Sequence, residues 1–455
     1  MATTMAPQRS RSRPAAAVAA AVAAVVMLAP TVVAVAPLRF PDAFPASRRD
    51  MLSRATAVRG SSAHSARRES ADSNAATPSF VGVNLGNFMV VEGWMDSAWW
   101  NSLSNGSVPV GQGEYQLCAA IGRAACTAAL TAHWDTWFAQ ADVEALAAAG
   151  VTHCRIPVGY WMWGPQFALP NDTYVIGGWP YLQRLLGWLS TAGLHAVVDL
   201  HGAPGSQNGH DNSGNSAGIG WDTPSNINAT VAVLAYMAAN FTALNSMPGY
   251  EGVVSGIEVL NEPWTTAVGG PIAMSTLQSF TAAAVAAIRD AGFTGDVWFP
   301  DGWDASWSGW VGFLTPPAAS GVYMDSHLYR CFGGYDDLTV WGQSNYSCAV
   351  DLPRLAAQVD TVPIIVGEYS LCIPNAPDYP YSLDGAMAMR AFAEAQLQAY
   401  GAVRNPGTGG AAGAFFWAAK VVDAPLWSYQ TALASGTMPD LSQNLTQAFF
   451  DCGSI

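Results

Sequence analysis

The chain has 455 residues, of which 51% are hydrophobic and 11% aromatic, and it includes 18 tryptophans. This length and composition exclude an intrinsically disordered protein and predict one large domain behind a leader. Residues 1–70 hold ten Arg and three acidic residues, whereas residues 71–455 hold nine basic and thirty acidic residues. Binding to nucleic acid needs Lys and Arg against phosphates, so the acidic body excludes nucleic acid as a partner and favours a neutral polymer.

The N-terminus predicts a targeting segment. Arg9, Arg11 and Arg13 precede an apolar run from Pro14 to Pro37. Residues 1–37 are therefore expected to be a cleaved signal peptide or a signal-anchor that tethers a type II membrane protein, and both alternatives stay open. Either one places the body outside the cell or at its surface. An organelle transit peptide is a third interpretation, because the leader is rich in Arg and Ser and poor in acidic residues.

Residues 38–78 are rich in Ser, Ala and Arg and lack an apolar period, which predicts a disordered linker before an ordered domain at 79–455. Six Asn-x-Ser/Thr triplets and seven cysteines in that domain are typical of a secreted glycoprotein. Cys118 and Cys126 are close enough in sequence to pair. Two further bridges can come from Cys331, Cys348, Cys372 and Cys452, with Cys154 left over. No cysteine and histidine spacing is typical of a metal site, and we expect no metal or organic cofactor.

Short apolar runs alternate with longer helical patterns through this domain. The expected strands are 80–84, 152–158, 195–200, 253–260, 296–300, 321–326, 363–366 and 411–417. The expected helices between them include 134–149, 181–192, 231–244, 276–291, 352–359 and 386–400. This alternation predicts an α/β fold, a (β/α)8 TIM barrel in a single catalytic domain. A doubly wound sheet is the alternative, but no complete Gly-rich phosphate loop follows the first strand.

Polar and ionisable residues gather where the expected strands end, and in a (β/α)8 barrel these ends form the face that holds the active site. Glu262 and Glu368 stand out, because each follows an apolar strand where a carboxylate is costly without partners. This favours a functional role over a structural ion pair with Arg155 or Lys420. The other polar or aromatic residues at strand ends are Asn84, Glu92, Asp199, His201, Asn261, Asp301, Trp303, His327, Tyr329 and Trp417.

Glycosidic bond cleavage needs one carboxyl group that protonates the leaving oxygen and a second that attacks or stabilises the anomeric carbon. Glu262 and Glu368 follow the fourth and seventh expected strands, on opposing sides of a barrel of eight. We therefore expect their carboxyl groups to lie about 5 Å apart, the separation that leads to retention through a glycosyl-enzyme intermediate.

Several longer motifs resemble glycoside hydrolase family 5, a member of the wider clan of retaining glycosidases, and more narrowly its fungal exo-β-1,3-glucanases. The motifs lie at 82–92, 155–161, 199–214, 260–263, 327–329, 366–368 and 416–417, and the resemblance covers about residues 79 to 450. The stretch at 199–214 is long enough to be specific, whereas Leu-Asn-Glu-Pro at 260–263 alone indicates only the clan.

The resemblance implies that Glu262 is the general acid/base and Glu368 the nucleophile. It also implies that Asn261 hydrogen-bonds the sugar 2-hydroxyl and that Arg155 keeps the nucleophile ionised. The remaining implied substrate-binding residues are Glu92, His201, Asn212, His327, Tyr329, Phe332 and Trp417, the last as an aromatic platform. A purely structural role is the alternative for most of these. For four tryptophans, a role as a platform for a sugar ring and a role in core packing are both open, namely Trp161, Trp163, Trp303 and Trp307.

Two departures from the resembled enzymes bear on specificity. Those enzymes carry Phe at the position of His210, as half of an aromatic clamp at the pocket entrance whose other half matches Phe332. Loss of one ring weakens the expectation of β-1,3 specificity in particular. The first motif reads Gly86-Asn87-Phe88 where Gly-Gly-Trp is usual, so the packing under Glu92 is also expected to differ.

These observations predict a retaining exo-β-glucanase that releases terminal glucose from β-1,3-glucan, with transglycosylation when acceptor sugars are abundant. A β-glucosidase of the same mechanism, acting on a β-1,6-glucan or a glucosylated lipid, is the alternative that His210 motivates. A catalytically inactive glucan-binding cell-wall protein is an alternative of another class. The retention of the site residues argues against it, namely Asn261, Glu262, His327, Tyr329 and Glu368. We expect a monomer, and exo against endo action is left open.

Overall fold

The computed structural model describes residues 80–304, 306–315, 317–358, 361–376, 382–402, 411–442 and 449–454. All of them fall in one compact unit, Ala76–Ile455. The expected leader at 1–37 and linker at 38–78 lie outside the described residues, as does the glycosylation triplet at Asn444.

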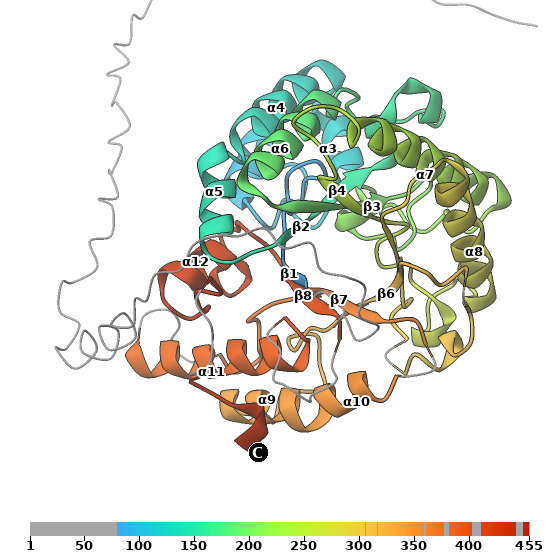
Figure 1. Cartoon of the computed structure of the whole chain (residues 1–455). Helices are drawn as coiled ribbons and strands as arrows, with labels where there is room; N and C mark the ends of the chain where they lie inside the picture. The colour runs from blue at the N-terminus through green and yellow to red at the C-terminus, as the bar shows by residue number, and fades with distance from the viewer. Residues whose placement is uncertain are drawn as a thin grey trace, which may run out of the picture. The chain divides into compact units, whose positions relative to one another are not determined.

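Eight parallel strands close into a barrel in which each strand pairs with the next and the last pairs with the first (Figure 1). This arrangement confirms the predicted (β/α)8 fold, and the strand ends lie within a few residues of the predicted ones. The strands are β1 (Phe80–Asn84), β2 (His153–Gly159), β3 (His195–Gly202), β4 (Val254–Glu258), β5 (Asp296–Pro300), β6 (Val322–His327), β7 (Ile364–Tyr369) and β8 (Gly413–Phe416). Both faces of a parallel barrel are covered, and the strands are accordingly buried along almost their whole length, including most of the polar residues that they carry.

Helices surround the barrel (Figure 1). They are α2 (Ser97–Ser104), α3 (Glu114–Ile121), α4 (Arg123–Thr136), α5 (Gln140–Ala148), α6 (Trp179–Ala192), α7 (Pro224–Leu244), α8 (Met274–Asp290), α9 (Val340–Tyr346), α10 (Leu352–Ala356), α11 (Leu383–Ala399) and α12 (Tyr429–Ala434). Within the described part of the β5–β6 connection, a short 3-10 turn at Ser308–Trp310 stands where other connections carry an α-helix.

The single helix predicted over 134–149 is wrong, because the structure divides it into α4 and α5. The Asp142 carboxylate accepts a hydrogen bond from the backbone N–H of Ala139 at 2.9 Å, and this caps a new helix that begins at Gln140. Such a cap carries little sequence signal inside an otherwise helical pattern, which explains the error.

Helix α7 is long and apolar enough to cross a membrane by length and composition alone. Its side chains Val233, Leu234, Met237 and Phe241 are buried in the main core. This burial is what a core helix of a globular barrel requires, and it accounts for the apolar composition of α7.

The cysteines confirm the sequence prediction in part. Cys118 and Cys126 form a disulfide between α3 and α4, as predicted. Of the two further bridges expected, the structure contains one, between Cys348 and Cys452. In this structure Cys331 and Cys372 are not joined to any partner, and Cys154 is a free, buried thiol as expected.

Candidate active site

A pocket of about 860 Å³ opens at the carboxyl ends of the strands. Nine of the eleven predicted site residues line it, namely Glu92, His201, Asn212, Glu262, His327, Tyr329, Phe332, Glu368 and Trp417. Arg155 and Asn261 do not line the pocket, but they are buried and hydrogen-bonded to each other at 2.8 Å. The (β/α)8 fold therefore brings the predicted residues together from all parts of the chain.

Glu262 and Glu368 face each other across the pocket floor with His327 between them. The nearest side-chain oxygens of the two glutamates and a ring nitrogen of His327 lie within 4.8 Å of one another. His327 Nδ1 is 2.7 Å from Glu262 Oε1 and 3.4 Å from Glu368 Oε2. Carboxylates this close are typical of retaining glycosidases, because inverting enzymes need a wider gap to hold a water molecule between them.

Arg155 holds Glu368 from below. Its guanidinium is fully buried and donates from Nη1 to Glu368 Oε1 at 3.0 Å. Its other hydrogen bonds go to Glu258 Oε2 at 2.6 Å and to Asn84 Oδ1 at 3.0 Å, and its Nη2 is 3.1 Å from Asp199. Because every face of the fork has a partner, the guanidinium is fixed in one orientation under the carboxylate.

Tyr329 completes the surroundings of Glu368. Its hydroxyl donates to Glu368 Oε2 at 2.6 Å, so the two carboxylate oxygens have separate donors on opposite sides. Two donors fix the carboxylate plane, which aims a lone pair into the pocket.

Burial and neighbouring charges shift the pKa values of the ionisable groups around the pocket. Burial raises the pKa of Glu368, and the nearby Glu262 adds to this, while His327 and Arg155 oppose it. Burial would also raise the pKa of Glu262, but the hydrogen bond and charge of His327 lower it to about 2. The pKa of His327 itself is raised well above its usual value despite burial, because Glu368 and Asp325 surround it. One proton is therefore held on the His327–Glu262 pair.

Two buried polar atoms near the glutamates have no hydrogen-bond partner among the described residues, Asn261 Nδ2 and His201 Nε2. The other side of each group is fixed, since Asn261 Oδ1 accepts from Arg155 and His201 Nδ1 contacts Asp199 Oδ2 at 2.6 Å. A buried donor or acceptor without a partner is unusual in a folded protein. Both atoms are suited to binding sugar hydroxyls.

Trp417 forms an aromatic face of the pocket and stacks on His201, with ring centroids 5.5 Å apart and planes within 10°. Glu92 lies on the wall close by and accepts a hydrogen bond from the Trp94 indole at 3.0 Å. Burial and the adjacent Asp211 raise the pKa of Glu92 well above its usual value.

The unusual Asn87 in the first motif has a clear structural role. Its backbone is left-handed, with φ of 56°, and its side-chain oxygen accepts from the backbone N–H of Glu92 at 2.8 Å. Asn tolerates this conformation better than most residues, so the departure from the usual motif shapes the turn that presents Glu92.

Glu262 is held by further contacts on the opposite side. Asn212 donates to Glu262 Oε2 at 2.8 Å and is itself fixed by Asn208, and the Trp303 indole also donates to Glu262. Asn212 was expected to bind glucose directly, and here its amide is directed to the carboxylate. The backbone of Glu262 is left-handed, with φ of 43°, a costly conformation for a non-glycine residue that is typical of functional sites.

The pocket rim carries two groups of aromatic rings. On one side Phe332, 75% exposed, packs near Tyr329 and Trp427, with ring centroids 5.5 and 6.1 Å away. On the other side His210 lies 6.0 Å from Trp264 and 6.3 Å from Trp303. The imidazole of His210 therefore stands at the rim in the place of the second aromatic ring of the clamp.

One predicted candidate lies elsewhere. Lys420 donates to the Trp137 carbonyl and stacks over the Trp137 ring, so it pairs with neither glutamate. Asp301 lines the main pocket, but its carboxylate accepts from the backbone N–H of Trp303 and from the Ser326 hydroxyl, which gives it a structural role.

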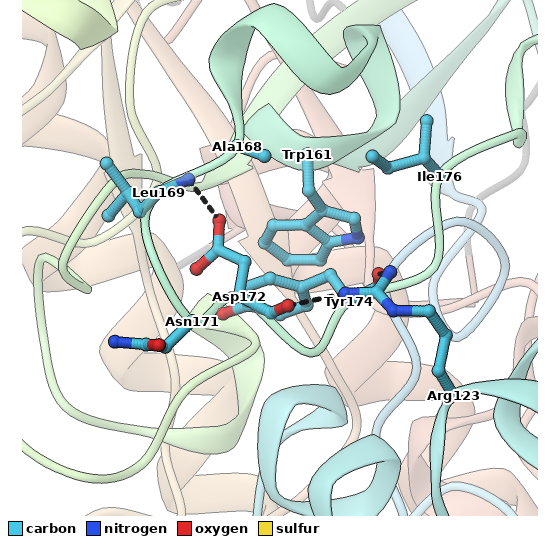
Figure 2. Close-up of a pocket in the computed structure, with 8 residues that line it drawn as sticks. All are labelled: Arg123, Trp161, Ala168, Leu169, Asn171, Asp172, Tyr174 and Ile176. Atoms are coloured by element: carbon cyan, nitrogen blue, oxygen red, sulfur yellow. Dashed lines mark hydrogen bonds between the residues drawn. The ribbon is translucent and has the colours of Figure 1, made fainter.

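The four tryptophans for which a sugar platform and core packing were both open, Trp161, Trp163, Trp303 and Trp307, differ in their location. Trp303 lines the main pocket, whereas Trp163 and Trp307 are buried. Trp161 lies in a separate surface pocket, where it stacks on Tyr174 with centroids 3.7 Å apart and Arg123 donates to the Tyr174 carbonyl (Figure 2). Core packing is therefore the better interpretation of the three that do not line the main pocket.

Sequence reasoning missed several residues that support the site. Glu258 in β4 and Asp325 in β6 are buried, and Asp325 contacts both His327 Nε2 at 3.2 Å and the Gly367 backbone N–H at 2.6 Å. A signal was available, because Asp325 precedes His327 by two residues and must share its face of the strand. Trp94 lies in the connection after β1 and Trp427 in a short 3-10 turn, Pro425–Trp427, after β8, and no sequence pattern marks them as pocket residues.

Two overlapping donor sets could hold a cation among the described residues, one of Glu258, Asp325 and His327 and one of Glu262, His327 and Glu368. Their atoms already contact one another, Arg155 and Tyr329. The expectation of no metal stays a prediction.

A parallel (β/α)8 barrel with two glutamates this close at the carboxyl ends of β4 and β7 has the architecture of a retaining glycoside hydrolase. No protein-family model matches the sequence. Curated relatives do: the probable glucan 1,3-β-glucosidase A of Neosartorya fischeri is 31% identical over 391 residues, which cover 79% of this chain and 86% of the relative. The glucan 1,3-β-glucosidase of Blumeria graminis is 31% identical over 396 residues, with the same coverage. The chain therefore belongs to the glucan 1,3-β-glucosidases of glycoside hydrolase family 5.

Solved structures agree on the fold. The rutinosidase from Aspergillus niger superposes with a TM-score of 0.65 at 22% identity, covering 79% of this chain and 98% of that structure. A second structure, AoRut, gives a TM-score of 0.67 at 22% identity and 80% coverage of this chain. At this identity the likeness extends to the fold alone.

Proposed function

We propose that this glycoside hydrolase releases glucose from the non-reducing ends of β-1,3-glucan with retention of configuration. The proposal rests on the two glutamates. A carboxylate oxygen of Glu262 lies within 4.8 Å of one of Glu368, and Glu368 accepts hydrogen bonds from Arg155 and Tyr329. The names of the curated relatives support the linkage and the exo mode of action.

In the proposed first step Glu368 attacks the anomeric carbon of the terminal glucose. Glu262 delivers a proton to the glycosidic oxygen, which leaves with the shortened glucan as an alcohol. The Asn261 amide, free at Nδ2, donates to the sugar 2-hydroxyl, a contact that strengthens as positive charge develops on the ring. In the second step Glu262 takes a proton from water, which attacks the glycosyl-enzyme and releases β-glucose. An acceptor sugar in place of water gives transglycosylation.

The proton for the first step comes from the His327–Glu262 pair. His327 Nδ1 lies 2.7 Å from Glu262 Oε1, so a proton can move along this contact without rearrangement. Asp325 stays on the far side of the ring at 3.2 Å and stabilises the imidazolium before transfer.

The remaining predicted residues bind and position glucose in this proposal. Trp417 supports the apolar face of the ring, and His201 and Glu92 bind its hydroxyls. Asn212 acts through Glu262, to which it donates. Phe332 forms one wall for the next glucose unit.

A second candidate function keeps the mechanism and changes the substrate to another β-glucoside, such as a β-1,6-glucan or a glucosylated lipid. His210 favours it, because a polar ring at the rim replaces an apolar one against Trp264 and Trp303. A hydrogen-bonding ring there would accept a leaving group that presents a hydroxyl instead of a flat sugar face.

The two candidate functions are distinguished by measuring the release of glucose from laminarin, pustulan, cellobiose and a glucosyl sterol. The first proposal expects kcat/KM on laminaribiose at least about 10-fold above that on gentiobiose, the range that one well-formed subsite can supply. It also expects that NMR detects β-glucose as the first product. Activity on pustulan or the sterol without activity on any β-1,3 substrate would support the second candidate, and α-glucose as the first product would contradict the mechanism of both.

We also propose that the body is secreted or held at the cell surface, with residues 79–455 as the catalytic domain. Two disulfides in the described residues support an oxidising compartment. A membrane tether through residues 1–37 stays a prediction, which is tested by whether extraction of the protein requires detergent. A monomeric state also stays a prediction, which is tested by measuring the size of the protein in solution.

A further inference from the structure

We propose that Cys331 and Cys372 form a third disulfide bond, which joins the loop after β6 to the loop after β7 along one wall of the pocket. The proposal does not depend on the substrate, because it concerns the covalent state of the fold.

The two thiols are already in contact. Both are partly exposed, and their side chains are hydrogen-bonded to each other. All seven cysteines of the chain lie in the described residues, and four of them are paired as Cys118–Cys126 and Cys348–Cys452. The seventh, Cys154, is fully buried in β2. Cys331 and Cys372 are therefore the two remaining cysteines outside the barrel strands, and they contact each other.

Both loops are held in place without the bond. The backbone N–H of Leu328 donates to the Glu368 carbonyl at 3.0 Å, and that of Leu371 donates to the Leu426 carbonyl at 3.1 Å. The backbone near each cysteine is therefore fixed by contacts that do not depend on the proposed bond.

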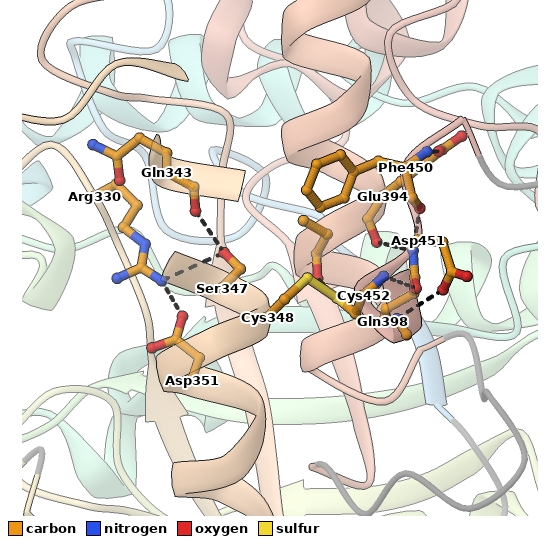
Figure 3. The surroundings of a disulfide bond; sticks show 12 residues. Arg330, Gln343, Ser347, Cys348, Asp351, Glu394, Gln398, Phe450, Asp451 and Cys452 are labelled. Atoms are coloured by element: carbon orange, nitrogen blue, oxygen red, sulfur yellow. Dashed lines mark hydrogen bonds and ion pairs between the residues drawn. A yellow bond between two sulfur atoms is a disulfide. The ribbon is translucent and has the colours of Figure 1, made fainter. Parts of the chain in front are cut away.

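Arg330 anchors the β6 loop next to Cys331. Its guanidinium is buried and pairs with Asp351 (Figure 3). It also lies 4.6 Å above the Tyr335 ring. Asp351 belongs to the same helical turn, Ser347–Asp351, as Cys348, which is bonded to Cys452 near the C-terminus (Figure 3). The existing disulfide and the proposed one would thus fix both ends of the same stretch of chain, 331–348.

The bond would lie directly behind the aromatic wall of the pocket. Cys331 stands between Tyr329, which donates to Glu368, and Phe332 at the rim. Cys372 accepts a hydrogen bond from the Trp427 indole, and the Trp427 ring lies 5.1 Å from that of Tyr329. A bond here would hold the three rings that face the substrate in one arrangement.

The chemistry is ordinary thiol–disulfide exchange. Hydrogen bonds from Cys331 and Trp427 lower the pKa of Cys372, which makes its sulfur the attacking thiolate. It attacks a sulfur of an external disulfide such as oxidised glutathione, and one glutathione thiolate leaves. Cys331, once deprotonated by solvent, then attacks Cys372 Sγ and displaces the second glutathione thiolate. The protein loses two thiol protons and two electrons, and the oxidant becomes two thiols.

Thiol counting on the native full chain tests the proposal. The protein is equilibrated in a glutathione buffer at the poise of the secretory pathway, then denatured without reductant in the presence of an alkylating reagent. We expect one alkylated cysteine per chain, Cys154, and a peptide map that contains a Cys331–Cys372 linked fragment.

Two variants serve as matched controls. Cys154→Ser should lower the count from one to none, and Cys372→Ser should raise it to two by releasing Cys331. A count of three in the unchanged protein, or linkage of Cys331 to any partner other than Cys372, would overturn the proposal.

Discussion

Glu262 and Glu368 share one histidine, yet their surroundings differ in kind. Glu368 accepts hydrogen bonds from the Arg155 guanidinium and the Tyr329 hydroxyl. Glu262 instead contacts His327, with which it can exchange a proton, and accepts from Asn212 and Trp303. A carboxylate with fixed donors on both oxygens suits attack on carbon, and one that exchanges a proton with an imidazole suits acid/base work. The two roles therefore follow from the contacts of each residue.

The acid/base role predicts a dependence on the leaving group. Glu262→Gln should lower kcat/KM on laminaribiose by at least about 10²-fold, the usual contribution of general acid catalysis, because the leaving sugar needs a proton. Cleavage of 2,4-dinitrophenyl β-glucoside should lose much less in its first step, since that phenolate leaves unprotonated. Steady-state and burst kinetics on both substrates measure the difference. Equal losses on the two substrates would mean that Glu262 has another role.

His210 predicts a change in the second subsite. His210→Phe should lower the KM for laminaribiose about 2- to 10-fold, because an added aromatic contact contributes about 0.5–1.5 kcal/mol. The KM for an aryl glucoside that does not reach the rim should stay unchanged, which makes it the internal control. A rise in the KM for laminaribiose would indicate that the imidazole itself binds the substrate.

At the scale of elements, the barrel strands support the site through residues that never touch the pocket. Glu258 of β4, Arg155 of β2 and Asp325 of β6 meet inside the barrel, where Arg155 Nε lies 2.6 Å from Glu258 and 3.9 Å from Asp325. The strands thus position Glu368 indirectly, by fixing the cation beneath it.

Removal of Glu258 should therefore affect both stability and activity. Glu258→Ala leaves the Arg155 Nε–H without its closest partner in a dry interior and should cost about 3–5 kcal/mol in the free energy of unfolding. Glu258→Gln should cost less, because its amide oxygen can still accept the hydrogen bond. Urea unfolding of the two variants measures this order. Equal stability of both variants with the unchanged protein would exclude a structural role for the pair.

The sequence predicted the strands and the residues at their ends because burial on both faces produces uninterrupted apolar runs, and polar residues are conspicuous where such runs stop. This reasoning located Glu262, Glu368, His327 and Trp417. It passed over Glu258 and Asp325, because a charge inside an apolar strand has no visible partner until the barrel closes around Arg155. Loop residues such as Trp427 could not be predicted, since their place depends on how connections of different length fold over the pocket.

For the whole molecule, Glu114 couples stability to pH. It begins α3 and is fully buried against the β1 and β2 connections, where Val175, Trp161 and Val91 approach its carboxyl without offsetting the burial. Burial raises the pKa of Glu114 from 4.5 to about 8. The folded state therefore keeps a proton that the unfolded chain has lost, and this stabilisation is fully present below pH 4.5.

Stability should consequently fall as pH rises through this window. Between pH 4.5 and about 8 the free energy of unfolding should decrease by up to about 1.4 kcal/mol per pH unit from Glu114 alone. Glu114→Gln should remove this slope and leave the protein more stable than the unchanged chain at pH 8, as urea titrations across the range would measure. Glu144→Gln, at an exposed position on α5, is the control and should leave the slope as it is. An unchanged slope in Glu114→Gln would contradict the assignment.

Mass spectrometry of the protein after reaction with 2,4-dinitrophenyl 2-deoxy-2-fluoro-β-glucoside tests the central claim most directly. The fluorine slows both steps and the good leaving group restores the first, so a covalent glycosyl-enzyme should accumulate. We predict that the intact mass rises by one fluoroglucosyl unit and that peptide mapping places the label on Glu368. Turnover of laminarin by a protein that never forms the adduct, or a label on another carboxylate such as Glu262 or Glu92, would contradict the account.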